Sequence, residues 1–181
     1  MIDFILNTDV KLLNFINVAI KNSLFDAIMP VITWGGSFYL VIVAGLLCAF
    51  LFKKDKIFYA GSFVAVMFLA RYSYRFLKLF FARGRPMFSY DWVNIIGFPL
   101  QSYAFPSGHS TVAFTCAVFM SFRFPKGRNY FLTVAAFVAF SRVYMGVHYP
   151  SDVLAGAVLG SLIAFLWHLF LEKLRSGRET A

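Results

Sequence analysis

Residues 151–171 read SDVLAGAVLGSLIAFLWHLFL, an apolar run whose only formal charge at neutral pH is Asp152, near its start. A tilted helix needs about 20 such residues to cross the hydrocarbon core of a bilayer. The whole chain has the same character, since 60% of its 181 residues are hydrophobic and only 14% are charged. Soluble domains contain about 45–50% apolar and about 25% charged residues. We therefore expect an all-α, integral-membrane helical bundle.

Four more apolar runs precede this one and are long enough for the same role. Together the five runs predict about five transmembrane helices in one domain over residues 1–181, at 28–52, 57–82, 107–124, 130–147 and 151–171. Pro30 and the pair Gly35-Gly36 lie near the start of the first run.

The N-terminal segment, residues 1–23, has a different pattern. Polar residues recur there at helical spacing along one face, at Asp3, Asn7, Lys11, Asn14 and Lys21. Polar groups along the whole length of a helix favour a position in the plane of the membrane interface. We expect an amphipathic interfacial helix, and a polar-faced spanning helix remains the alternative.

Basic residues concentrate in three segments next to these runs, at 53–56, 123–128 and 173–178. If five helices alternate in direction, all three segments lie on one side, which the positive-inside rule makes cytoplasmic. We expect the inner (cytoplasmic) membrane, a cytoplasmic C-terminus, and a loop at 83–106 that faces the periplasm or cell exterior. The net charge of +9 would suggest nucleic acid in a soluble protein. Here the basic residues lie in short loops between apolar runs and in one cluster that resembles a catalytic site, so we expect no nucleic-acid partner.

Three polar segments lie at the outward ends of the runs. They are KLFFARGRP at 78–86, PSGH at 106–109 and SRVYMGVHYPSD at 141–152. Transfer of a phosphoryl group depends mainly on positioning and on positive charge around its equatorial oxygens. A turn that enters a helix also presents free backbone N–H groups to an anion. The predicted phosphate-binding residues are therefore Lys78, Arg85, Ser107, Gly108 and Arg142.

Two histidines fit complementary roles in this chemistry. An imidazole titrates near pH 6.5, so a neutral ring can attack phosphorus while a protonated ring gives its proton to the leaving alkoxide. Asp152 follows His148 by four residues and could accept a hydrogen bond from its ring N–H. We therefore expect His148 to be the nucleophile and His109 the acid.

Each of these residues also has an ordinary structural interpretation when it is taken singly. A histidine at a helix end is usually a surface residue, and an arginine at a membrane interface usually extends to the head groups. Together, however, they gather polar groups on one side of an apolar bundle, where charged residues are functional candidates. Arg71 and Arg75 precede Lys78 on roughly one helix face. They could contact a head group or second phosphate, or be structural. Arg83 flanks either the site or only the interface.

The three segments resemble the signature of the type 2 phosphatidic acid phosphatase superfamily, Lys-x6-Arg-Pro, Pro-Ser-Gly-His and Ser-Arg-x5-His-x3-Asp. Every defining position is present, in order. The resemblance implies that His148 forms a phosphohistidine, that Asp152 orients it, and that His109 protonates the leaving group and then activates water. It implies no metal or other cofactor. Two histidines and an aspartate could also hold zinc, but three adjacent cations argue against a dication there.

The apolar spans and the expected outward-facing site indicate a membrane lipid substrate that enters sideways from the bilayer. Undecaprenyl diphosphate, phosphatidylglycerol phosphate, phosphatidic acid and a lipid A phosphate all suit such a site. The alternatives are a lipid phosphotransferase with the same site and, ranked lower, a non-enzymatic transporter. No obligatory protein partner is indicated.

Overall fold

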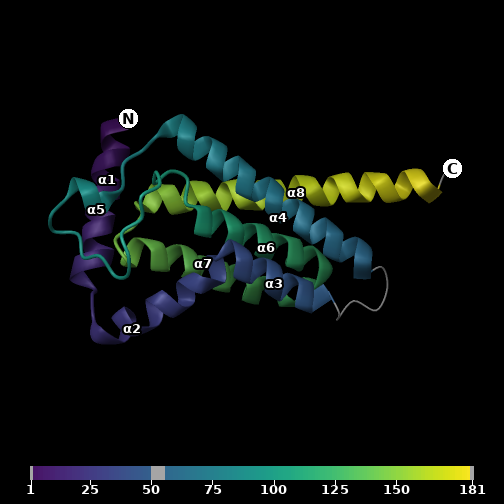
Figure 1. Cartoon of the computed structure of the whole chain (residues 1–181), viewed down its shortest axis with the longest axis horizontal. Helices are drawn as coiled ribbons and strands as arrows, with labels where there is room; N and C mark the ends of the chain where they lie inside the picture. Colours follow the sequence, from purple (N-terminus) through teal and green to yellow (C-terminus); the bar gives the residue numbers. More distant parts are fainter. Residues whose placement is uncertain (1, 50–55, 180–181) are drawn as a thin grey trace.

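The computed structural model describes residues 2–49 and 56–179, and the regular elements within those ranges are all helical (Figure 1). In chain order they are α1 (Ile2–Asn14), a π-helical turn (Phe15–Ala19), α2 (Ser23–Ile32), a 3-10 turn (Thr33–Gly36), α3 (Phe38–Ala49), α4 (Lys56–Phe81), α5 (Pro86–Ser89), α6 (Gly108–Arg123), a 3-10 turn (Pro125–Gly127), α7 (Arg128–Tyr144) and α8 (Pro150–Glu179).

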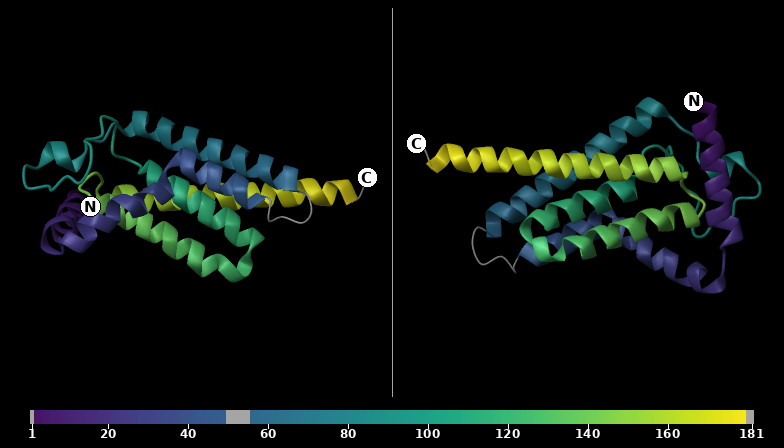
Figure 2. Two further views of the ribbon diagram at one scale, coloured as in Figure 1. Left: turned by 60° about the horizontal axis from the view of Figure 1, so that its bottom comes forward. Right: turned by 180° about the vertical axis from the view of Figure 1, so that it is seen from behind.

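Helix α6 lies at the centre of the bundle and packs against α8, α7 and α4, while α3 packs against α4 (Figures 1 and 2). The largest buried cluster joins α3, α4, α6 and α8, and it includes Val66, Met67, Ala70, Val112 and Ala164. Lys78, His109 and Asp152 lie on α4, α6 and α8, so this cluster sets the relative positions of three helix ends that form the site.

Two glycines on α8 permit close approach of its backbone to that of α6. A Cβ atom on Gly156 would lie 2.6 Å from the Ser107 carbonyl oxygen, and one on Gly160 would lie 2.3 Å from the Thr111 carbonyl oxygen. Thr115 Oγ1 donates to the Gly160 carbonyl at 3.2 Å. Small residues four apart let helix backbones approach in this way. This spacing brings the first turn of α8 against the first turn of α6.

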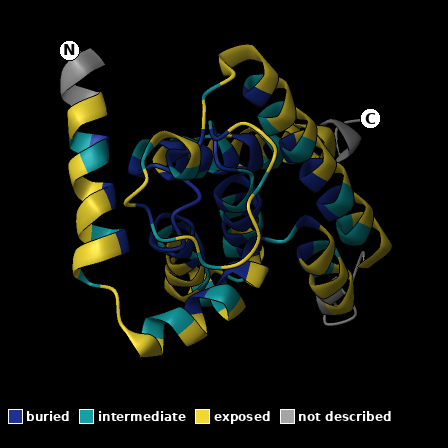
Figure 3. Cartoon of the chain, turned by 60° about the vertical axis from the view of Figure 1, so that its left-hand side comes forward, coloured by how far each residue is buried: buried dark blue, intermediate teal, exposed yellow. Residues whose placement is uncertain are grey.

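The outer faces of the long helices are apolar and exposed, as in a protein that lies in lipid (Figure 3). On α8 the exposed side chains recur along one face at Leu154, Val158, Leu162, Phe165 and Leu169. Apolar faces of this extent are rare on soluble monomers. Two segments, Lys56–Ser89 and Pro150–Ser176, are long and apolar enough to cross a membrane. The protein is therefore an all-helical integral-membrane bundle.

The number of five spans stays a prediction. Helices α3, α6 and α7 have 12, 16 and 17 residues, at or below the lower end of the usual range of about 17–25 for a spanning helix. The pair Leu6–Ala19 and Ser23–Gly36 passes the same test only together, with an angle of 116° between its halves. It could form one broken span.

The first predicted run, 28–52, is not one continuous helix. Helix α2 already begins at Ser23, where the Asn22 side chain caps it by accepting from the Phe25 N–H at 2.9 Å. A 3-10 turn at Thr33–Gly36 then separates α2 from α3, and residues 50–52 lie outside the described part of the chain. Glycine has low helix propensity, which favours a break at Gly35-Gly36. The break also lets this backbone approach α6 and α7.

Helix α1 lies across the end of the bundle rather than along the long helices (Figures 1 and 2). The predicted polar stripe is exposed at Asn7, Lys11 and Asn14, whereas Asp9 and Leu13 are buried. The side chain of Asp3 is outside the described ones. This orientation suits the interfacial placement that the sequence predicts, which itself stays a prediction.

The predicted basic segments at 123–128 and 173–175 lie at the end of the bundle opposite α1 (Figure 1). Lys53, Lys54 and Asp55 lie outside the described residues. The gathering of positive charge at this end supports the expected direction of insertion, and the identity of the membrane stays a prediction.

Candidate active site

The three polar segments meet at the end of the bundle where α4 ends and α6 and α8 begin. They surround a cavity of about 260 Å³. Five of the eight predicted catalytic and phosphate-binding residues line it, namely Lys78, Arg85, Gly108, His109 and His148. Asp152, Ser107 and Arg142 are buried beside it. Residues more than 70 positions apart in the sequence therefore form one polar site in an apolar bundle.

His148 lies between a carboxylate and a guanidinium. Its Nδ1 atom is 3.3 Å from Asp152 Oδ2, and its Nε2 atom is 3.3 Å from Arg85 Nη1. Because an ionised carboxylate only accepts hydrogen bonds and a guanidinium only donates them, Nδ1 carries the proton and Nε2 the lone pair. Asp152 also accepts from the Tyr149 backbone N–H at 2.9 Å. The ring is therefore held in the tautomer that a nucleophile requires.

The surroundings of His148 keep its ring neutral. Its side chain is only 2% exposed. Burial, followed by the positive charges of Arg85, Lys78, Arg142 and Arg83, lowers the pKa of His148 well below its usual value near 6.5. The free protein thus presents an unprotonated imidazole to the cavity at neutral pH.

Arg83 connects Asp152 to the N-terminal helix. Its guanidinium donates to Asp152 Oδ1 and to Asp9 Oδ2, each at 2.7 Å. Asp9 in turn accepts from the Ser151 backbone N–H at 2.8 Å and from the Ser151 hydroxyl. The guanidinium also lies 4.1 Å from the centroid of the Tyr149 ring. The sequence left open whether Arg83 flanks the site or only the membrane interface. In the structure it lies at the site, behind the His148–Asp152 pair.

Lys78 and Arg85 hold the loop that covers the cavity. Lys78 Nζ donates to the carbonyl oxygens of Tyr103 and Ala104. Arg85 Nε donates to the Ser102 carbonyl at 2.5 Å, and Nη1 donates to the Val147 carbonyl at 2.7 Å. These acceptors are neutral, and neither Lys78 nor Arg85 forms an ion pair with a carboxylate in the part of the chain that the structure describes. The cations are therefore positioned and ready for an anion.

Arg142 is almost completely buried. Its Nη1 atom donates to Thr33 Oγ1 at 2.6 Å, yet its Nε has no hydrogen-bond partner among the described residues. A buried donor without a partner is uncommon in native proteins. The break after α2 supplies Thr33, so the interruption of the first apolar run contributes directly to the site. The unpaired donor fits an anion-binding role.

Ser107 caps α6 and joins it to α8. Its hydroxyl accepts from the Ser110 N–H at 3.4 Å, and its own N–H donates to the Asp152 carbonyl at 2.9 Å. The N–H groups of Gly108 and His109 follow in the first turn, where no intrahelical acceptor exists. A Cβ on Gly36 would lie 2.8 Å from His109 Cβ. The 3-10 turn thus holds His109 at the cavity.

The two weaker candidates separate in the structure. Arg71 lines the same cavity as His148, and its guanidinium lies 4.4 Å from the centroid of the Phe38 ring. Arg75 is exposed and is not among the residues that line the cavity. A head-group contact within the cavity is therefore available to Arg71 alone of this pair.

Sequence reasoning missed several residues that support the site. They are Asp9, Thr33, Gly36, Gly156 and Gly160. The Gly-x3-Gly spacing on α8 and a carboxylate on the apolar face of α1 were signals that could have pointed to three of them. Thr33 and Gly36 gave no such signal, because their contacts with Arg142 and His109 join distant parts of the chain.

The described residues contain no group of three His, Cys, Asp or Glu side chains arranged to hold a metal ion. His148 and Asp152 instead face the cations described above. The metal-free reaction stays a prediction for the assay below.

Comparison with known proteins agrees with this geometry. Residues 59–176 match the model of the PAP2 superfamily, and they include all three motif segments. The chain is similar to a lipid A 4'-phosphatase of Porphyromonas gingivalis, with 30% identity over 93% of this chain and 75% of the relative. It is 33% identical to an undecaprenyl-diphosphatase of Sulfolobus acidocaldarius over 86% of this chain and 73% of the relative.

Among solved structures, the fold resembles the first transmembrane PAP2 type phosphatidylglycerolphosphate phosphatase from Bacillus subtilis. The TM-score is 0.71 at 29% identity, and the match covers 93% of this chain and 87% of that one.

Proposed function

Since this chain belongs to the PAP2 superfamily and is a phosphatase, we propose that it removes the terminal phosphate of a membrane lipid phosphate or diphosphate through a phosphohistidine at His148. The observation that carries the proposal is the position of His148. Asp152 fixes its Nδ1, and its Nε2 lies beside Arg85 at the wall of a cationic cavity. This is the orientation needed for attack on a bound phosphoryl group.

In the first step the Nε2 lone pair of His148 forms a bond to phosphorus while the bond from phosphorus to the lipid oxygen breaks. Lys78, Arg85 and Arg142 surround the phosphoryl oxygens, on which negative charge is spread. His109 gives its proton to the departing lipid oxygen. The negative charge of the bound phosphate offsets the surrounding cations, which allows His109 to hold that proton in the complex.

In the second step a water molecule attacks the phosphohistidine. His109, now neutral, accepts a proton from this water. The water oxygen bonds to phosphorus while the bond between phosphorus and His148 Nε2 breaks. Inorganic phosphate leaves and His148 returns to its neutral form. Asp152 stabilises the positive charge that the ring carries while it is phosphorylated.

The substrate class follows from what lines the cavity. The phosphate end contains the cations, and the side towards α3 contains Phe38, Tyr39 and Arg71. A lipid would place its terminal phosphate at His148 and a second anionic group near Arg71. Undecaprenyl diphosphate and phosphatidylglycerol phosphate have such a second group, and relatives named for each are similar to this chain. Phosphatidic acid and a lipid A phosphate remain in the panel to be tested.

The test is phosphate release from these four lipids in detergent, with EDTA present because the reaction uses no metal ion. His148→Ala should lower kcat by orders of magnitude, whereas Tyr130→Ala, which removes an exposed ring at the other end of the bundle, should leave it unchanged. Acid-labile phosphate on the wild-type protein after a rapid quench should be absent in His148→Ala. Full activity in His148→Ala would exclude this nucleophile, and activity that requires zinc would exclude the metal-free reaction.

A further inference from the structure

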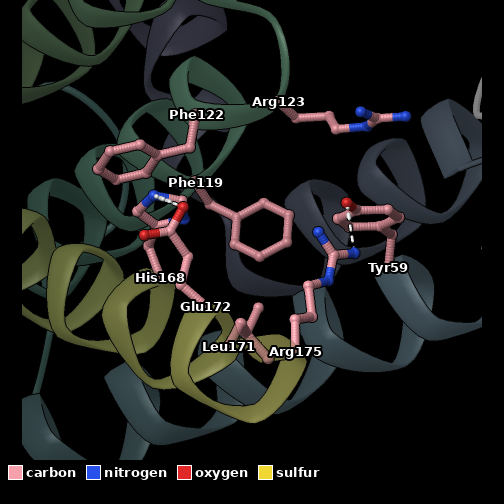
Figure 4. A pocket seen from close by; sticks show the side chains of 8 residues that line it. All are labelled: Tyr59, Phe119, Phe122, Arg123, His168, Leu171, Glu172 and Arg175. Carbon is pink, nitrogen blue, oxygen red and sulfur yellow. Dashed lines mark hydrogen bonds and ion pairs between the residues drawn. The ribbon is translucent and has the colours of Figure 1, made fainter. Parts of the chain in front are cut away.

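A second cavity lies at the opposite end of the same helices. Arg123 ends α6, and at 1.5 Å per residue it is about 20 Å from His109 at the start of that helix. The cavity has a volume of about 230 Å³ (Figure 4). Its lining comes from α4, α6 and α8 and consists of Tyr59, Phe119, Phe122, Arg123, His168, Leu171, Glu172 and Arg175. None of these residues belongs to the catalytic motifs.

One wall of this cavity is cationic. The Arg123 guanidinium lies 4.7 Å from the centroid of the Tyr59 ring, and that of Arg175 lies 5.0 Å from it. Arg175 Nη2 also donates to the Tyr59 hydroxyl at 2.6 Å (Figure 4). Tyr59 therefore contacts a guanidinium group from each of two other helices, and its ring lies between them in the view of Figure 4. Guanidinium groups suit phosphate because they offer paired donors.

The other side of the cavity is less charged. Glu172 is the only carboxylate among the described residues that line it, and it lies 3.4 Å from His168 Nε2, with a side chain that is 63% exposed. His168 stacks on Phe122 at a centroid distance of 3.8 Å. Figure 4 shows the His168–Glu172 pair apart from Tyr59, with Phe119 between them in this view. The cavity thus retains a positive wall next to aromatic and aliphatic surface.

A phosphate beside hydrocarbon is the chemistry of a phospholipid head group. Phe122 is exposed on the apolar outer face of the bundle, so acyl chains could leave the cavity directly into lipid. Basic pockets between helices on the cytoplasmic side bind anionic head groups in this way. This end of the bundle also contains the basic segments at 123–128 and 173–175.

We propose that the cavity formed by Tyr59, Arg123 and Arg175 binds the phosphate of an anionic membrane phospholipid, such as phosphatidylglycerol, as a bound structural lipid. The bound lipid joins α4, α6 and α8 at the end of the bundle opposite the catalytic site. The opposite ends of these three helices carry Lys78, His109 and Asp152. The lipid would therefore stabilise the helix arrangement on which the site depends, without being hydrolysed.

The experiment compares the protein in phosphatidylcholine nanodiscs with and without phosphatidylglycerol, and counts the lipids retained after detergent exchange by native mass spectrometry. Wild type should retain phosphatidylglycerol in preference to phosphatidylcholine and unfold at a higher temperature with it. Arg123→Gln/Arg175→Gln should reduce this preference tenfold or more, since a direct hydrogen bond to a charged phosphate contributes about tenfold or more to affinity. Arg123→Lys/Arg175→Lys, which keeps both charges, should preserve most of it.

Lys126→Gln/Lys173→Gln removes the same charge from the same end but leaves the cavity intact, so its lipid preference should stay within about twofold of wild type. An equal loss in this control would show diffuse attraction and overturn the proposal. The proposal is also overturned if inorganic phosphate added to phosphatidylcholine nanodiscs reproduces the stabilisation, because the ligand would then be a free anion. Because the comparison is between lipids for each variant, a general loss of stability in the glutamine variant does not affect the outcome. Phosphate release is not the readout, so this result is independent of the proposed catalytic step.

Discussion

Replacing Gly160 with alanine tests whether helix packing positions the catalytic residues. A Cβ at this position would lie 2.3 Å from the Thr111 carbonyl oxygen, against 3.4 Å or more for an ordinary contact. The opposing atom belongs to backbone and cannot turn aside. Helices α6 and α8 must therefore separate locally by about 1 Å, because the hydrogen-bonded helix backbone resists any other adjustment.

The separation has two calculable consequences. Misplacement of catalytic groups by about 1 Å can cost about 100-fold in rate, and α6 and α8 carry His109 and Asp152 respectively. We expect kcat to fall by about 10- to 100-fold. Overpacking costs about 1–3 kcal/mol, and the helix preference of alanine over glycine returns about 0.5–1 kcal/mol. The net loss of unfolding free energy should be about 1–2 kcal/mol.

Gly61→Ala is the matched control, because a Cβ at Gly61 of α4 meets nothing within 4 Å. It should keep kcat and retain or slightly raise the unfolding temperature. The measurements are phosphate release in detergent and thermal unfolding of both variants. If Gly160→Ala matched wild type in kcat and unfolding temperature, the α6–α8 contact would not set the geometry of the site.

Two further predictions concern the charges behind the nucleophile. Arg83→Gln leaves the buried carboxylates of Asp9 and Asp152 without their shared cation. We expect the unfolding free energy to fall by about 2–4 kcal/mol, somewhat less than for a fully buried pair because Arg83 is 22% exposed, and kcat to fall at least tenfold. Wild-type stability of the variant in thermal unfolding would contradict this prediction. Because the pKa of His148 is lowered, we expect the acid limb of the pH profile of kcat/KM to lie below pH 6.5. Arg83→Gln removes one positive charge and should move this limb to higher pH. Both proteins are measured with the same substrate, so that the ionisation of the substrate cancels. If Arg83→Gln left the acid limb unaltered, the electrostatic explanation would be refuted. The lowered pKa of His148 also means that this histidine contributes folding stability above about pH 6.5, and that this contribution is lost as the pH falls towards the pKa of the folded state.

The residues that we propose to perform the chemistry could be predicted from the sequence because their types and spacings are local. A proline, serine, glycine and histidine at 106–109 predict a helix start that faces an anion, and the structure has this helix start at the cavity. The four-residue spacing of His148 and Asp152 likewise predicts their contact, which lies at 3.3 Å. The apolar runs predicted a helical membrane bundle, since no soluble fold of this size could bury that much apolar surface.

Only the tertiary structure decided what holds these residues in place. The contact of Asp9 with Ser151 and Arg83 joins the first helix to the last, and Thr33 reaches Arg142 across more than 100 residues. Such pairs depend on where a helix breaks and on how closely two helices pack, which are set by the sum of many contacts rather than by a local pattern. The sequence by itself thus determined which residues between 78 and 152 are candidates for the chemistry, and it determined the membrane environment. The packing of α1, α2 and α8 around them determined the orientation of the nucleophile, because a side chain is fixed only by groups that folding brings to it.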